Sequence, residues 1–448
     1  MPYFSEHTNE RLASRFPRRR AAVALLALFA LAIAIALPGN SARRPLTAHE
    51  AFVARTAVEM QRRGEYVVPY FNSELRIQKP PLSYWFQMLA SRARGEAQLA
   101  PQDEFNARLP SIVLGAATVV LTACLGWIVF DSWLIGILGG LLFATNMAFL
   151  EWARSAQPEM AYGFGCALFL VATAWARRAA LEGRGTWPAA LCAWTAVAIA
   201  ILIKGPIIPV LLIAGAAFGM RKRAGGPGFL RTLHAPAGVA WMLALVVPYF
   251  ALVAQRVPGA LEYWRAQMFD RAGGLEAAWW QPVELFYVGQ ALESWMPWSV
   301  LLLLVPIWLW RWRGKERRGE LDPASQARLR GARFLGWCAV VPCIALSFSA
   351  GRKGYYLLPM IPVMAQLMAW IVAEIFRAAR ERPASARALT RGLQAHALFF
   401  AALAIGLIFL VSSRRQRLGL EHEAWVGVGS ALAIAACLAI AGFVASRR

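Results

Sequence analysis

The sequence predicts an all-α integral membrane protein, a bundle of about twelve transmembrane helices with a long first outer-face loop that carries interfacial helices. The 448 residues are 58% hydrophobic and only 16% charged, which is far less charge than a soluble protein of this length has. Apolar runs of the length that crosses a bilayer recur along the chain. The net charge of +22 lies in short basic clusters between these runs. This pattern follows the positive-inside rule and argues against a nucleic-acid partner.

The predicted spans, in chain order, are 21–38, 109–130, 132–150, 159–176, 187–203, 205–220, 235–254, 286–310, 334–350, 355–376, 395–412 and 424–445. The first run follows "RFPRRR" and precedes "GNSA", so it also fits a signal peptide, but its length favours a retained helix. All six cysteines lie inside apolar runs, which argues against a disulfide framework or a zinc module.

The basic loops set the predicted orientation. Residues 1–20 form a basic cytoplasmic segment, and both termini are expected in the cytoplasm. Residues 21–376 form one transmembrane module with outer loops at 39–108 and 255–285, and 377–448 add C-terminal helices without a soluble domain. The loop at 412–425 is basic but should face outward, so a count of eleven or thirteen spans stays open.

The first outer loop is too long for a simple connector. It begins with "HEAFVARTAVEMQRRG", a predicted helix on the membrane surface whose apolar face comprises Phe52, Val53, Ala57 and Met60. The "KPP" corner follows, where two prolines remove backbone donors and disfavour helical geometry at Lys79. We therefore expect a rigid, extended corner that presents this lysine outward.

Ionisable residues gather on the predicted outer face: His49, Glu50, Lys79, Arg154, Glu159, Lys204, Asp270, Arg271, Arg352 and Lys353. Cations neutralise phosphate oxygens and a carboxylate accepts a hydroxyl proton, so this set suggests a phosphorylated substrate with its lipid tail in the bilayer. Each residue also has a simpler interpretation. Glu50 can complement a helix dipole, Lys79 can snorkel, and Glu159 can cap a span.

The order of motifs resembles the GT-C membrane glycosyltransferases, in the branch of bacterial aminoarabinose transferases and protein O-mannosyltransferases. The resemblance runs from about residue 20 to about residue 375 and depends on the "HEAF…KPPLSYW" stretch, "ARSAQPEM", "IKGPI", "YWRAQMFDR", "MPW" and "SAGRKGYYLLPMIP". The "KPPLSYW" and "GRKGYYLLP" blocks are the more specific ones.

This resemblance implies transfer of a sugar from a polyprenyl-phosphate carrier to a glycolipid, polysaccharide or protein acceptor, on the periplasmic face of a bacterial inner membrane. It implies catalytic roles for His49, Glu50 and Glu159. The residues expected to bind substrate are Lys79, Tyr84, Arg154, Lys204, Arg271, Arg352, Lys353 and Tyr356. Lys79 would hold the donor phosphate with Arg352 or Lys353, and no cofactor is implied.

Three positions depart from the family pattern. His49 stands where the family has Asp, so the base is either this histidine, with its unperturbed pKa near 6.5, or a carboxylate at Glu50 or Glu159. Gln78 and Met268 replace a Glu and a His of the aminoarabinose branch. If those two positions bind a metal in relatives, both ligands are missing here, so we expect no metal and leave the identity of the sugar open.

Two other functions stay open. A transporter or flippase of lipid-linked sugars should place ionisable residues near mid-span and show two corresponding halves, and the sequence shows neither. An inactive binder of lipid-linked sugar is possible because of His49.

Overall fold

The computed structural model describes residues 18–38, 40, 45–93, 104–221, 228–273, 286–349 and 352–381, with five single positions beyond them. Side chains from 267 to 273 lie outside the description. The chain divides into two compact units, Met1–Trp370 and Ile371–Arg448. The expected division after residue 376 stays a prediction, and the description below concerns the first unit except where an element's bounds extend past it.

Ten predicted apolar runs coincide with helices in the described chain. Single helices are α1 (Arg18–Ala36), α4 (Glu104–Phe130), α7 (Glu159–Leu181), α8 (Trp187–Ile203), α9 (Ile207–Gly219), α11 (Ala235–Arg256) and α15 (Pro323–Ser347). Three runs are divided: α5 (Trp133–Ala144) with α6 (Met147–Trp152), α13 (Phe286–Ser294) with α14 (Ser299–Arg317), and the 3₁₀ helix η3 (Gly354–Met360) with α16 (Ile361–Glu381). The runs 395–412 and 424–445 lie almost entirely outside the described residues.

Fewer helices meet the length for a span than the sequence predicts. Six described helices are long and apolar enough, or seven if α13 and α14 form one broken span with a bend of 119°. Helices α5, α8 and α9 are apolar but shorter. The chain is therefore an integral membrane protein, while the count of about twelve is not confirmed.

The first predicted outer loop folds into α2 (Ala48–Arg63), a two-stranded antiparallel hairpin of β1 (Tyr70–Phe71) and β2 (Glu74–Leu75), and α3 (Leu82–Ala93). Thr47 and Glu50 form a capping box at the start of α2, and Gly64 ends the helix at φ 64°, where glycine meets no steric penalty. The helix itself is confirmed, while its position on the membrane surface stays a prediction. Val53, Ala57 and Met60 of its apolar face are buried against α3, while Phe52 is half-buried.

The bundle is built from close helix pairs, in which α7 packs on α8 and on α4, α4 on α5, and α9 on α15. Small residues allow this approach: a Cβ on Gly136 would lie 2.3 Å from the Ala123 carbonyl oxygen. Gln366 of α16 is buried here and donates to the carbonyls of Thr122 (2.7 Å) and Gly136 (3.2 Å).

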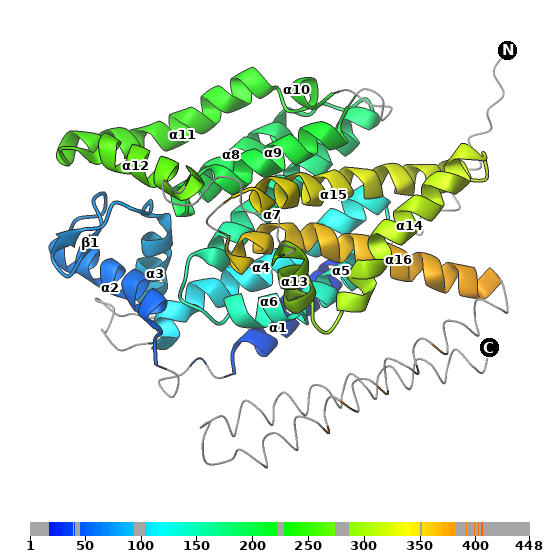
Figure 1. Ribbon diagram of the computed structural model, residues 1–448, viewed down its shortest axis with the longest axis horizontal. Coiled ribbons are helices and arrows are strands. Elements are labelled where there is room, and N and C mark those ends of the chain that lie inside the picture. Colours follow the sequence, from blue (N-terminus) through cyan, green and yellow to red (C-terminus); the bar gives the residue numbers. More distant parts are fainter. Residues whose placement is uncertain are drawn as a thin grey trace. The chain divides into compact units, whose positions relative to one another are not determined.

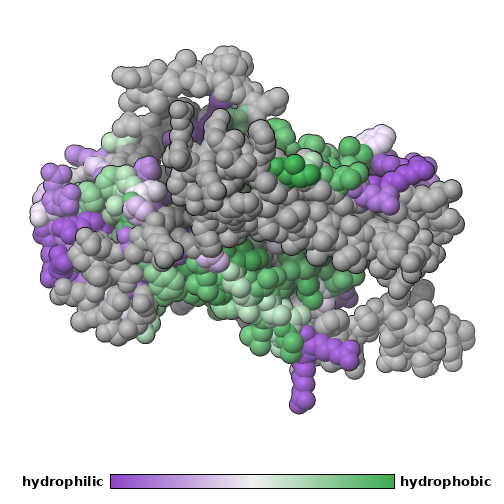
Figure 2. All heavy atoms as spheres, turned by 90° about the horizontal axis from the view of Figure 1, so that it is seen from below, coloured by the Kyte–Doolittle hydropathy of each residue, from purple (hydrophilic) through white to green (hydrophobic). Residues whose placement is uncertain are grey.

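Polar and apolar regions separate along the molecule. In Figure 1, α2, α3 and the hairpin lie together at one end of the bundle, next to α12 (Ala260–Gly273); the short α10 (Phe229–Thr232) precedes α11. Figure 2 shows apolar side chains gathered along the middle of one face and polar ones toward its ends, which fits a surface that crosses a bilayer. The first-loop elements thus lie at a polar end.

Candidate active site

A buried ion pair joins the start of α7 to the end of α8. Glu159 is the first residue of α7, and Lys204 follows the last residue of α8. The Lys204 Nζ lies 2.8 Å from Glu159 Oε1, and the two side chains are 15% and 4% exposed. The other carboxylate oxygen, Oε2, is buried and has no hydrogen-bond partner among the described residues. A buried carboxylate with one unused acceptor oxygen is costly unless something binds there.

Tyrosine rings surround the ammonium group of Lys204. Its Nζ lies 4.1 Å from the ring centre of Tyr355, 5.5 Å from that of Tyr356 and 5.7 Å from that of Tyr162. The Tyr162 hydroxyl donates to the Gly205 carbonyl at 3.0 Å, and Gly205 has φ 124°, a conformation that favours glycine. The aromatic contacts and the ion pair fix the lysine head group from several sides.

The Lys-Pro-Pro corner approaches the same carboxylate. Lys79 lies within electrostatic range of Glu159, and it is half-buried. Trp264 of α12 donates its indole N–H to the Ile77 carbonyl at 2.8 Å, two residues before the lysine. Ile77 also packs in a cluster with Tyr249 and other side chains of α11. The corner is therefore supported from α11 and α12.

Glu50 has a different environment from Glu159. Its side chain is enclosed, at 1% exposed, and forms an ion pair with the equally buried Arg108 at 2.8 Å. Burial opposes ionisation, but hydrogen bonds from Arg108 and from the Thr47 and Ala156 amides outweigh it and lower the pKa of Glu50 to about 2. The carboxylate stays ionised at neutral pH.

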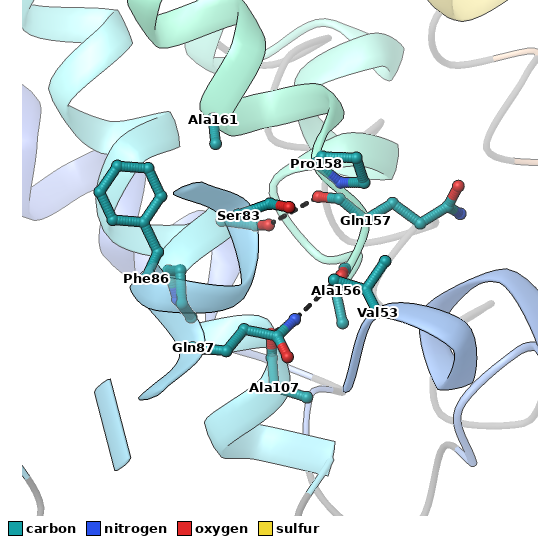
Figure 3. A pocket seen from close by; sticks show the side chains of 11 residues that line it. Val53, Ser83, Phe86, Gln87, Ala107, Ala156, Gln157, Pro158 and Ala161 are labelled. Carbon is teal, nitrogen blue, oxygen red and sulfur yellow. Dashed lines mark hydrogen bonds between the residues drawn. The ribbon is translucent and has the colours of Figure 1, made fainter. Parts of the chain in front are cut away.

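The α6–α7 loop, residues 153–158, leads directly into Glu159 and is held by several side chains. The Ala156 amide donates to Glu50 Oε1 at 2.9 Å, and Gln87 Nε2 donates to the Ala156 carbonyl at 3.2 Å. The Ser111 hydroxyl contacts the Gln157 carbonyl at 3.4 Å. Figure 3 shows the small pocket next to this loop, with Gln87 pointing toward Ala156.

The remaining predicted residues occupy varied positions. His49 is exposed on α2, where its ring packs edge-on against Phe52. Arg154 donates to the Pro38 carbonyl at the end of α1. Tyr84 is fully buried in the α2–α3 cluster, and burial raises the pKa of its hydroxyl.

The basic side chains near η3 are more exposed to solvent. Arg352 is half-buried and donates to the Ser349 carbonyl at 3.3 Å, and Lys353 is exposed just before η3. Arg271 lies in α12, but its side chain is outside the described residues, as is that of Met268.

The structure thus brings Glu159, Lys204, Tyr356 and Lys79 together and gives Glu50 a separate network. Arg108, Tyr162 and Tyr355 are contacts that sequence reasoning missed as site residues. Arg108 is the last residue of the predicted outer loop and precedes an apolar run, which is the position of an ordinary flanking charge. Within the described chain, no group of three or more His, Cys, Asp or Glu side chains is placed to hold a metal ion, and the expected absence of a metal stays a prediction.

Comparison with known proteins supports the fold. Residues 78–252 match the family model described as dolichyl-phosphate-mannose-protein mannosyltransferase. An uncharacterized protein of Aquifex aeolicus is 26% identical, over 72% of this chain and 58% of that protein. The undecaprenyl phosphate-alpha-4-amino-4-deoxy-L-arabinose arabinosyl transferase of Serratia proteamaculans is 22% identical, over 83% of this chain and 62% of its own length. The chain spans less than two thirds of both relatives.

Solved structures have a similar fold. The crystal structure of ArnT from Cupriavidus metallidurans in the apo state superimposes with a TM-score of 0.63 at 19% identity, covering 95% of this chain and 76% of that one. The same protein bound to undecaprenyl phosphate gives a TM-score of 0.62 at 18% identity, covering 94% and 76%. This chain therefore has the fold of ArnT, and its sequence is similar to that of an aminoarabinose transferase.

Proposed function

We propose that this protein transfers a sugar from a polyprenyl-phosphate carrier to a hydroxyl of an acceptor, on the periplasmic face of a bacterial inner membrane. The observation that supports this most directly is the buried Glu159–Lys204 pair, which keeps one unused carboxylate oxygen and has Lys79 within electrostatic range. A carboxylate acceptor beside cations suits a reaction in which a hydroxyl attacks and a phosphate leaves.

The proposed chemistry is a substitution at the anomeric carbon of the donor sugar. The bond between that carbon and the phosphate oxygen breaks, and a bond to the acceptor oxygen forms. The acceptor proton passes to a base, and the electron pair of the broken bond leaves on the polyprenyl phosphate. Lys79, with Arg352 or Lys353, would neutralise the charge that develops there.

The choice of base follows from the hydrogen bonds that each carboxylate already accepts. Glu159 has an unused oxygen at the site, so we assign it as the base that receives the acceptor proton. His49 is exposed and is the second candidate, because an imidazole can accept a proton from a hydroxyl. Lys204 would hold the Glu159 carboxylate in place through the ion pair.

The comparisons support the carrier class. The matched family model names dolichyl-phosphate-mannose, and the Serratia proteamaculans relative and the bound ArnT structure name undecaprenyl phosphate. The bundle surface is apolar along its middle, where the lipid tail of such a carrier would lie. The acceptor is expected to be a glycolipid, a polysaccharide or a protein hydroxyl.

Transfer of radiolabelled sugar from polyprenyl-phosphate donors in membranes tests the proposal. We expect product with wild type and a loss of about 100-fold or more with Glu159→Gln and Lys79→Ala. Glu182→Gln is the matched control, because Glu182 pairs with Arg178 just beyond the other end of α7. No product with any donor, together with donor binding by wild type, would favour the binder or flippase instead.

A further inference from the structure

We propose that Glu50 and Arg108 form a positioning pair that holds the α6–α7 loop and thereby places Glu159 in the active site. This inference depends on the proposed function, since it assigns Glu50 to holding the site and not to proton transfer. It also gives a role to Arg108, which the motifs do not identify.

Both carboxylate oxygens of Glu50 accept two hydrogen bonds each. Glu50 Oε1 accepts from Arg108 Nε (2.8 Å) and from the Ala156 amide (2.9 Å). Glu50 Oε2 accepts from Arg108 Nη2 (3.1 Å) and from the Thr47 amide (2.9 Å). Arg108 Nη2 also donates to the Pro45 carbonyl at 3.2 Å.

This arrangement leaves little room for Glu50 as a base. A general base must come within hydrogen-bond distance of the proton that it removes. Each Glu50 oxygen already has two donors, and the side chain is 1% exposed. An acceptor hydroxyl would have to displace a donor from a buried carboxylate, which is unfavourable.

The same contacts connect segments that are distant in sequence. Arg108 belongs to α4, Glu50 to α2 and Ala156 to the loop, at sequence separations of 58 and 106 residues from Glu50. Gln87 of α3 adds a second hold on this loop, because its Nε2 donates to both the Ala107 and Ala156 carbonyls. The Ala156 amide is therefore tied to α2 through Glu50, and the Ala156 carbonyl is tied to α3 through Gln87, which is the contact drawn in Figure 3.

A displacement of the Ala156 position would be transmitted to Glu159 through the short segment that joins them. Pro158 stands directly before the glutamate and restricts the backbone there. Moving Ala156 would therefore move the carboxylate relative to Lys204 and the bound donor. Small displacements of a reacting group are costly in rate.

A double-mutant cycle tests the pair, with Glu50→Gln, Arg108→Met and the combined variant assayed for kcat, KM and pH dependence of transfer. We expect each single variant to lower kcat with little change in donor KM. The kcat of the combined variant should be at least about tenfold higher than the value expected if the two single effects multiplied, because the combined variant removes both buried charges. In Glu50→Gln the acid limb of the pH profile should remain, since another group is the base. Glu182→Gln is again the control.

The opposite results would overturn the proposal. They are an Arg108→Met variant near wild-type kcat, effects of the two substitutions that simply multiply, or loss of the acid limb in Glu50→Gln. Gln87→Leu is a milder change that tests the same loop if the charge variants do not fold. A kcat lowered several-fold supports the proposal, and wild-type kcat contradicts it.

Hydrogen exchange of residues 153–158 separates this inference from the proposed function. The Ala156 amide should exchange at least about tenfold faster in Glu50→Gln than in wild type, whatever reaction the protein catalyses. If wild type transfers no sugar from any donor, the proposed function fails while this measurement still tests the pair. Unchanged exchange would contradict the pair even with full activity.

Discussion

Acid should destabilise the wild-type protein more strongly than it destabilises Glu50→Gln. The pKa of Glu50 is lowered from 4.5 to about 2 in the folded protein. A carboxyl group with a lowered folded pKa stabilises the fold above its unfolded pKa and loses that contribution as the pH falls through the folded pKa. The relevant window therefore runs from about pH 5 down to pH 2.

The size of the effect follows from the shift. A difference of roughly 2.5 pKa units corresponds to about 3 kcal/mol at neutral pH, of which about 2 kcal/mol is lost by pH 3. Solvent screens this ion pair weakly, because the side chains of Glu50 and Arg108 are both almost fully buried.

Reversible denaturation in micelles at several pH values, followed by tryptophan fluorescence, measures this. Other acidic groups with lowered pKa values, such as Glu59 and Glu65, titrate in both proteins and cancel in the difference. We expect the stability difference between wild type and Glu50→Gln to shrink by about 2 kcal/mol between pH 6 and pH 3. A constant difference over this range would refute the reasoning about the buried pair.

Three further outcomes follow from the packing. Lys204→Met removes the ammonium group that pairs with the buried Glu159 carboxylate, so the free energy of unfolding should fall by about 3 kcal/mol, and adding Glu159→Gln should restore part of it in the same denaturation assay. Trp264→Phe removes one hydrogen bond to the segment before the Lys-Pro-Pro corner, and should raise the donor KM several-fold at similar kcat; an unchanged KM would contradict this support. Gly136→Ala places a methyl group against backbone and should lower the unfolding free energy by about 1–3 kcal/mol, whereas Gly185→Ala, where a Cβ meets open space, should not.

Local patterns predicted most of the described helices correctly. The capping box at the start of α2 depends on two residues three positions apart, and hydropathy depends on continuous runs, so both can be read along the chain. The apolar face of α2 was predicted for the same reason. The number of spans is not confirmed, because α5, α8 and α9 are shorter than the usual length of a span and two predicted runs lie almost entirely outside the described residues.

The contacts within the site could not be predicted from local sequence patterns. The sequence identified Glu159, Lys204 and Lys79 as candidates because all three lie on the predicted outer face. It could not pair them, since Glu159 and Lys204 are 45 residues apart and meet only when α7 packs on α8. Nor could it tell Glu50 from Glu159, two carboxylates at helix starts whose burial and partners differ.

The sequence by itself determined that this is a membrane protein of long apolar helices with a polar first loop and a proline-stiffened lysine, because these features depend on composition and neighbouring residues. Tertiary structure alone decided that Arg108 occupies both oxygens of Glu50 while Glu159 keeps one oxygen unused. The physical reason is that ion pairing and desolvation depend on distances between helices, which no local pattern specifies.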